Sequence, residues 1–429
     1  MMRSMFSGVS GLRVHQTKMD VIANNISNVN TTAYKSSRAT FSEVFSQTLS
    51  GASAPNDFTK RGGINPMQIG LGVNLASIDK SMTNGAAQRT DNPLDLMIQG
   101  DGFFIMADGS GTYFTRAGSF TEDMDGFLSQ NGMKLMGWDA QFDPQIKEFA
   151  IERGSTVPLQ ISGSKEYMLP AITTQVNFSG NINPNTDPVV RRTMSFYDSV
   201  GTKYLLDVTM EFQSTPQLNG SQWTLTFGDE IYVNGDRSKP VAIGPPTAVV
   251  IDFDANGVYS STQNMAVNIV PSANLSPGAT IGGNGGQIDL NFSDLFQFVN
   301  ENTNAIALNK DGNPPGHLSG LSVGGDGKIT GRYSNGTTRL LGQVPLAKFK
   351  NPEGLEKMGQ NLFSTTPNSG GFDGVGTDGE MQGGVLEMSN VDLSQEFTEM
   401  ITTQRGFQAN SRVITTSDDM LQELVNLKR

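Results

Sequence analysis

Both ends of the chain repeat apolar residues at intervals of seven. The first repeat comprises Met5, Leu12, Met19 and Ile26, and Ile22 lies three residues after Met19. The second repeat comprises Leu393, Met400, Phe407, Ile414 and Leu421, and Phe397 and Val425 lie four residues after Leu393 and Leu421. This spacing places an apolar seam along one side of a helix, as in helices that pack side by side. It predicts a coiled-coil-like axial domain built from residues 1–35 and 386–429, in which each helix is the other's partner.

Polar residues mark the ends of the two predicted helices. Ser4 is a candidate N-cap for the first helix, and Asn390 or Asp392 for the second, with Glu396 in its first turn. The first pattern ends in NNISNVNTTAYK at 24–35, where Asn and Thr side chains compete with the helix for backbone hydrogen bonds.

Further apolar residues lie off these seams. They are Phe6, Val9, Val14 and Val21 in the first helix, and Val413, Met420, Leu424 and Leu427 in the second. Two helices on one molecule would leave much of this surface in water, at about 25 cal/mol per Å². A stalk on a single molecule and a polymer of identical copies both remain open. The uncovered surface favours the polymer, so we take the seam residues as its candidate polymerisation site.

Between the helices the apolar period changes to two, which is typical of half-buried strands. The alternating runs are Leu206–Phe212, Trp223–Phe227, Val249–Phe253 and Ile288–Phe292. Turn signals include Asn256-Gly257, the DSVG at 198–201, and Asp125-Gly126. Because strands do not alternate with helices, we expect antiparallel sheets rather than a parallel nucleotide-binding sheet. The fold class is therefore multidomain α+β.

Two β domains are expected between the helices. The inner domain comprises 80–165 and 312–385, and an outer domain, 166–311, is inserted into it. Pro170-Ala171 and DGNPPG at 311–316 mark the two linkers. Residues 36–79, which contain GASAPNDFTKRGGINP, are predicted to be an extended, poorly packed connector.

Composition excludes several function classes. A net charge of −12 argues against a nucleic-acid partner, which needs a basic face. The chain contains no Cys, and its two His residues, His15 and His317, are far apart, so thiol and Cys-zinc chemistry are excluded and a Ser–His–Asp relay has no local support. No cleavable signal peptide and no membrane span are recognised. Targeting signals alone would place the protein in the cytoplasm.

Some short motifs invite a catalytic or binding interpretation that their context does not support. Gly374, Gly376 and Gly379 fit G-x-G-x-x-G, but no hydrophobic strand precedes them and no helix follows. Asp252, Asp254, Asn256 and Gly257 resemble the start of a calcium loop, but Gln263 stands where the closing Glu belongs. The carboxylate pairs Asp123/Asp125 and Asp418/Asp419 are read as solvated surface charges. We therefore predict no catalytic residues, no cofactor and no metal.

Several segments resemble the axial proteins of the bacterial flagellum, the family of rod, hook and hook-associated proteins. They are FSGVSGL (6–12), ANNISNVNTTAYK (23–35), DLMIQGDGFFIM (95–106), TRAGSFTEDMDGFLSQNGMKLMGW (115–138) and the whole stretch 386–429. The segments occur in the family's order and cover more than a third of the chain, whereas 166–311 carries little of the resemblance.

The resemblance implies a structural subunit that polymerises into the flexible flagellar hook. The second β domain at 166–311 points to the hook, and the alternative is a distal rod or hook-associated protein. Implied partners are further copies of the chain, the rod, hook cap and hook–filament junction proteins, and the flagellar type III export apparatus. Export would place the protein outside the cell without a cleaved signal. The absence of Cys excludes the Cys–Lys cross-link of some hook proteins. A secreted hydrolase and a surface adhesin are the rivals from other classes.

Overall fold

The computed structural model divides the chain into two compact units. It describes residues 2–55, 62–143, 148–213, 220–238, 240–243, 248–260, 265–269, 279–283, 286–299, 301–372, 375–376 and 380–427. Unit 1 comprises Met1–Gly163, Leu321–Thr330 and Leu340–Arg429, and unit 2 comprises Ser164–Gly320 and Gly331–Arg339. The chain thus enters unit 2 from unit 1 and returns, so unit 1 contains both ends of the sequence.

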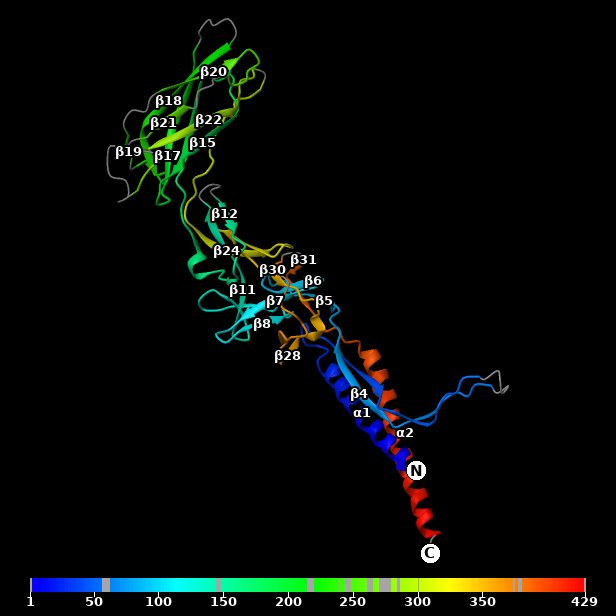
Figure 1. The fold of residues 1–429 in the computed structure, drawn as a ribbon. Coiled ribbons are helices and arrows are strands. Elements are labelled where there is room, and N and C mark those ends of the chain that lie inside the picture. The colour runs from blue at the N-terminus through cyan, green and yellow to red at the C-terminus, as the bar shows by residue number, and fades with distance from the viewer. Residues whose placement is uncertain are drawn as a thin grey trace. The chain divides into compact units, whose positions relative to one another are not determined.

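Two long helices of unit 1 contain the heptad repeats. Helix α1 spans Met2–Ser27 and helix α2 spans Leu393–Asn426, and they lie side by side and antiparallel (Figure 1). Asp392 is the N-cap of α2, because its carboxylate accepts hydrogen bonds from the backbone N–H groups of Ser394 and Gln395. The predicted cap of α1 is wrong: the helix already begins at Met2, so Ser4 lies inside its first turn.

The β-structure of unit 1 is mainly antiparallel. Its central strands follow the order β11-β7-β8-β29-β28, and β26 pairs with β11 through Trp138 and Gln343. The strands are β1 (Ser37–Glu43), β2 (Ser46–Ser50), β3 (Met67–Gly70), β4 (Val73–Lys80), β5 (Ala87–Arg89), β6 (Leu96–Gln99), β7 (Phe103–Ala107), β8 (Thr112–Thr115), β9 (Thr121–Glu122), β10 (Leu128–Gln130), β11 (Met133–Asp143), β12 (Glu148–Ile151), β13 (Val157–Pro158), β27 (Leu346–Ala347), β28 (Glu356–Gly359), β29 (Leu362–Ser364), β30 (Val375–Gly376), β31 (Glu380–Gly383) and β32 (Val385–Glu387). A 3₁₀ helix, η2, spans Pro352–Gly354.

Two short ladders tie distant parts of unit 1 together. Strand β5 pairs with β32, and β6 pairs with β31, so the segment that precedes α2 is hydrogen-bonded to the start of the inner β structure. The cores of unit 1 are formed by buried apolar side chains such as Phe104, Leu135 and Leu346. The described part of 36–79 forms two antiparallel hairpins, β1–β4 and β2–β3.

Unit 2 contains two sheets that share one hydrophobic core. One has the order β21-β22-β15-β23, and the other contains β16, β17, β18 and β19, with β20 paired to β18. The strands are β14 (Tyr167–Met168), β15 (Gln175–Asn181), β16 (Val189–Tyr197), β17 (Lys203–Gln213), β18 (Gly220–Val233), β19 (Pro240–Ala242), β20 (Val249–Asp254), β21 (Met265–Asn268), β22 (Gln287–Phe296) and β23 (Ile306–Asn309), with a 3₁₀ helix, η1, at Gly163–Lys165. The boundary between the units falls within β24 (Gly316–Val323), β25 (Lys328–Tyr333) and β26 (Thr338–Gln343).

The four alternating runs predicted from the sequence all form strands of unit 2. They lie in β17, β18, β20 and β22, with Met210, Trp223, Ile251 and Ile288 fully buried. The expectation that all strands are antiparallel is wrong for one pair, because β15 and β22 run parallel from Gln175–Asp289 to Asn181–Phe296. Parallel strands need a long crossover, and here strands β16 to β21 lie between the two in sequence.

The stretch that resembles a calcium loop is a hairpin turn. The Asp254 carboxylate accepts hydrogen bonds from the backbone N–H groups of Asn256 and Val258, and these bonds lower the pKa of Asp254. Gly257 has φ 77°, the left-handed conformation that the turn requires. Gln263, Gly374 and Gly379 lie outside the described residues, and Gly376 lies in β30.

Candidate assembly surface

Helices α1 and α2 approach each other closely along a line of small residues. A Cβ atom on Gly8 would lie 3.1 Å from Ile414 Cγ1, and one on Gly11 would lie 2.6 Å from Asn410 Nδ2. One on Gly406 would lie 2.8 Å from the His15 ring. A larger side chain at these positions would therefore require the facing side chains, or the helices themselves, to shift.

Other contacts along the helix pair show the same antiparallel register. The hydroxyls of Ser4 and Ser417 lie 3.5 Å apart, and Lys18 Nζ lies 3.1 Å from the Glu399 carboxylate. Asn25 donates to Glu396 at 2.9 Å. The C-terminal two turns of α2, from Met420 on, therefore extend beyond the level of the first residue of α1. We call this end of the pair the tip, and the end at Ser27 and Leu393 the root.

The most buried positions of α2 are not those of the predicted seam. Thr403 and Ser417 are buried, and both lie on the heptad line of Asn410. The large apolar residues of α2 do not indicate this line. The signal in the sequence is the repeat of small and polar residues at intervals of seven in α2, together with the glycines of both helices. Burial of the predicted off-seam residue Val14 likewise differs from the expectation that it is exposed.

The predicted seam residues flank the line of close contact. In α1, Ile22 is buried and Met5, Leu12, Met19 and Ile26 are half-buried. In α2, Met400, Phe407, Ile414 and Leu421 are half-buried, and Leu393, Phe397 and Val425 are exposed. The intramolecular pairing thus covers part of the seam and leaves apolar surface at the root and at the tip.

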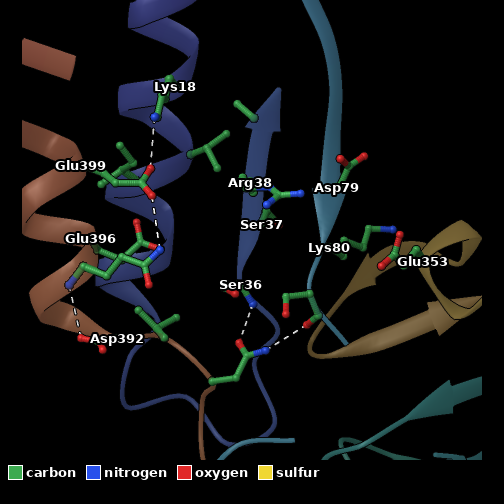
Figure 2. Close-up of a pocket in the computed structure, with 17 residues that line it drawn as sticks. Lys18, Ser36, Ser37, Arg38, Asp79, Lys80, Glu353, Asp392, Glu396 and Glu399 are labelled. Atoms are coloured by element: carbon green, nitrogen blue, oxygen red, sulfur yellow. Dashed lines mark hydrogen bonds and ion pairs between the residues drawn. The ribbon is translucent and has the colours of Figure 1, made fainter. Parts of the chain in front are cut away.

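A pocket of about 390 Å³ lies at the root, where α1, the start of α2, β1 and β4 meet (Figure 2). Its lining is polar and of mixed charge: Lys18, Arg38 and Lys80 face a surface that also carries Glu396 and Glu399. Burial raises the pKa of Glu396, the charge of Glu399 adds to this, and the hydrogen bond from Asn25 opposes it. The part of the chain that the structure describes contains no group of three or more His, Asp or Glu placed to hold a metal ion.

Asn25 and Asn390 attach the chain segments around this pocket. The Asn25 side chain donates to the Ser37 carbonyl at 2.8 Å and accepts from the Ser37 N–H at 3.0 Å. Asn390 accepts from the Ser36 N–H and donates to the Ser81 carbonyl (Figure 2). The start of β1 is thereby bonded to α1, and the residues next to β1 and β4 are bonded to the segment that leads into α2.

A buried charge cluster lies beyond the root. The Lys35 ammonium lies 2.7 Å from the Glu387 carboxylate, and the two side chains are 0% and 1% exposed. Lys35 also donates to the Thr83 carbonyl at 2.6 Å, and the Gly85 N–H donates to Glu387 at 3.0 Å. The buried Arg116 guanidinium lies 3.8 Å from Glu387. Burial lowers the pKa of Lys35, and the Glu387 charge partly offsets this.

This cluster connects three distant parts of unit 1. Lys35 follows α1, Glu387 precedes α2, and Arg116 follows β8 in the inner β structure. A buried ion pair contributes little net stability but is expensive to break, so it favours one arrangement of these parts over alternatives. Lys35 and Arg116 lie in two of the segments that carry the family resemblance, 23–35 and 115–138, but no pattern in the sequence indicates that they contact Glu387.

The carboxylate pairs and the histidines occupy unremarkable positions. Asp123 accepts from its neighbour Met124 in a turn, and Asp418 and Asp419 are exposed on α2. His317 is exposed in β24, and His15 is half-buried at the helix crossing with a buried Nδ1 that has no hydrogen-bond partner. Within the described residues, no helix is long and apolar enough to cross a membrane.

The hairpins after α1 present a second apolar surface. Phe45, Leu49 and Ile64 are all more than half exposed. Covering such side chains in a contact with another molecule would be favourable. Unit 1 thus presents uncovered apolar side chains on its hairpins and at both ends of the helix pair.

Four family models match successive parts of the chain. "Flagella basal body rod protein" matches residues 5–35, and "Flagellar hook protein FlgE/F/G D1 domain" matches 97–159. "Flagellar basal body protein FlaE D2 domain" matches 168–313, and "Flagellar basal body rod FlgEFG protein C-terminal" matches 382–427. Together with paired terminal helices and β units inserted between them, these matches define an axial protein of the bacterial flagellum.

Full-length relatives narrow this class. The chain is 38% identical to the flagellar hook protein FlgE of Borreliella burgdorferi and 37% identical to that of Treponema pallidum, over 100% of both chains in each case. The crystal structure of the Helicobacter pylori flagellar hook protein FlgE2 has a similar fold, with a TM-score of 0.50 and 15% identity, over 70% of this chain and 100% of that one.

The chain belongs to the flagellar hook protein family. It is therefore a structural, self-polymerising component of the flagellum, located at the hook, and its family is not one of enzymes.

Proposed function

We propose that this subunit forms a flexible universal joint that transmits torque from the rod to the filament. The paired helices α1 and α2 form the axial part of the polymer, and their seam residues join neighbouring copies. The observation that carries the proposal is the apolar surface left on the helix pair: Phe6, Phe397 and Leu424 are about half exposed or more. A neighbouring copy of the chain would cover this surface.

Bending requires some contacts between copies to hold and others to exchange. Dry apolar contacts between the helices hold each row of subunits together, whereas polar, hydrated contacts between β faces exchange partners at small cost. Unit 2 supports the second role, because β17 alternates buried side chains such as Leu206 with polar residues, and exposes Lys203 and Glu211 at its ends.

The hairpins at 36–79 supply contacts between copies and freedom to move. Their exposed apolar residues, Phe45 and Leu49 among them, support a role in contact. Gly51 and Gly62 have open space around the Cβ position, and glycine itself permits more backbone conformations than other residues, which supports a role in movement. Gly63 and Gly70 lie in the same hairpin.

The remaining partners follow from the position of a hook between rod and filament. They are the rod, the hook cap and the hook–filament junction proteins. The chain leaves the cell unfolded through the flagellar type III export apparatus, without a cleaved signal peptide, and folds at the growing end of the polymer.

Charged substitutions in the seam test this function. Leu393→Asp combined with Phe407→Asp should abolish polymerisation, because two carboxylates would enter an apolar contact. Gln404→Asp combined with Gln408→Asp adds the same charge to the same helix at exposed polar positions, and should assemble normally. Polymers are counted by electron microscopy, and circular dichroism checks that the β units remain folded. Normal hooks from the first variant would refute the seam.

A further inference from the structure

The exposed apolar residues of α2 form two separate patches. The root patch consists of Leu393, Phe397 and Ile401, and the tip patch consists of Val413, Met420, Leu424 and the C-cap residue Leu427. Val425 is also exposed at this end but lies on another side of the helix, outside the tip patch. Phe397 is 49% exposed and Leu424 is 51% exposed. The exposed face between the patches is polar, with Gln404, Arg405 and Gln408. Each helix pair therefore offers two distinct adhesive ends rather than one continuous stripe.

The two patches point to different sides of α2. At 3.6 residues per turn, the centres of the patches are separated by about 150° around the helix axis. The line that contacts α1, through Thr403, Asn410 and Ser417, passes between them on one side. The root patch is therefore turned away from the α1 helix of the same molecule, whereas Leu424 of the tip patch lies on the α1-facing line but beyond the level that α1 reaches. One flat partner could not cover both patches.

The tip patch also continues an interface that already exists. Ser4, in the first turn of α1, faces Ser417 of α2. The heptad line Thr403–Asn410–Ser417 continues to Leu424, which lies beyond the first turn of α1 and therefore does not contact that helix. The residue type changes at the same point, from small and polar along α1 to large and apolar beyond it. The acidic residues Asp418, Asp419 and Glu423 project from other sides of the helix, which leaves the patch uncharged.

We infer that the root patch of one copy packs against the tip patch of a neighbouring copy. This inference rests on the proposed function, and it specifies how the polymer is joined. A contact between two different patches is heterologous: one copy keeps its tip patch free and the other keeps its root patch free, so the assembly extends instead of closing as a dimer. Phe397 and Met420 or Leu424 are 23 and 27 residues apart. At about 1.5 Å per residue, contacting copies are displaced by roughly 35–40 Å along the helix axis.

Cross-linking between copies tests this arrangement, because the chain has no Cys and only introduced thiols react. Full-length Phe397→Cys and Leu424→Cys chains are polymerised separately and as a mixture, and treated with a short bismaleimide. The mixture should give at least a tenfold higher yield of covalent dimer than either variant alone. Met420→Cys replaces Leu424→Cys if that variant fails to polymerise. Gln408→Cys mixed with Leu424→Cys is the control, since its site is exposed but outside both patches.

The outcomes separate this inference from the proposed function. Polymers of normal appearance that cross-link equally well in the Phe397→Cys variant alone, or in the Gln408→Cys control, would overturn the root-to-tip contact and leave the hook function intact. Normal polymers with no cross-link in either mixture would also overturn it. Failure of the unaltered chain to polymerise would reject both.

Discussion

Removing the charge of Glu387 is the sharpest test of how unit 1 is held together. Glu387→Gln keeps the shape of the side chain and removes only the negative charge. Lys35 is fully buried and lies 2.7 Å from the carboxylate, and Arg116 is buried 3.8 Å away. In the variant, the Lys35 ammonium would lie in a buried site without a counter-charge, and Arg116 would keep only the nearby charge of Asp101.

The expected loss of stability follows from these contacts. Breaking a buried ion pair by removing one partner typically costs about 3–5 kcal/mol. The Gln carbonyl can still accept from the Lys35 ammonium and from the Gly85 N–H, which places the expected loss at the lower end, about 3 kcal/mol. That corresponds to a change of roughly 150-fold in the folding equilibrium of unit 1.

Asp326→Asn is the matched control. Asp326 lies 2.8 Å from the Lys328 ammonium, but both side chains are about half exposed. A surface pair of this kind contributes about 1 kcal/mol or less. The same chemical change, carboxylate to amide, is thus made once in a buried and once in a hydrated ion pair.

Tryptophan fluorescence can follow unit 1 separately. Trp138 lies in unit 1 and Trp223 in unit 2, and the chain has no other Trp. In a Trp223→Phe background, urea unfolding of unpolymerised chains is followed by Trp138 emission for the parent and both variants. If Glu387→Gln shifts the unfolding free energy no more than Asp326→Asn does, the cluster does not hold unit 1 together and the reasoning fails.

Two further predictions concern the helix crossing. Burial, and to a lesser extent the Lys18 charge, lowers the pKa of His15 from 6.5. As pH falls through 6.5, the unfolded chain binds this proton before the folded chain does. The free energy of unfolding should therefore decrease below pH 6.5 and level off below the lowered pKa of the folded state. His15→Asn should remove this part of the pH dependence, as measured by unfolding at pH 7 and pH 5. Gly11→Leu should destabilise the helix pair by about 1–3 kcal/mol, because the new side chain overlaps Asn410, whereas Gln16→Leu on the exposed face of α1 should be nearly neutral in thermal melts of helical circular dichroism. An unchanged pH dependence, or equal melts for the two Leu variants, would contradict the geometry described for His15 and Gly11.

Local sequence patterns were sufficient to predict both long helices and four strands of unit 2. The interval of seven predicts both terminal helices, because helical periodicity is a property of consecutive residues, and Asp392 is recognisable as an N-cap for the same reason. Alternation at Leu206, Trp223 and Ile251 likewise predicts three strands of unit 2. That the two ends pair could be inferred too, since neither helix has an apolar partner near it in sequence.

The candidate assembly surface was predictable only in part. The seam residues were identifiable from their spacing, but which of them remain exposed depends on how α1 and α2 are oriented about each other. The helices approach closely at Gly8, Gly11 and Gly406, and Thr403 is buried on α2. The spacing of small residues along a helix does not show which side of that helix faces its partner.

By itself the sequence determined the two long helices, the four alternating strands of unit 2, and that the ends carry more apolar surface than they can bury separately. These are consequences of side-chain type and interval along the chain. Only the tertiary structure decided the pairing of Lys35 with Glu387, 352 positions away, the parallel alignment of β15 with β22, and the division of exposed apolar surface into root and tip patches. Each of these depends on contacts between residues distant in sequence, and such contacts leave no periodic signal in a single chain.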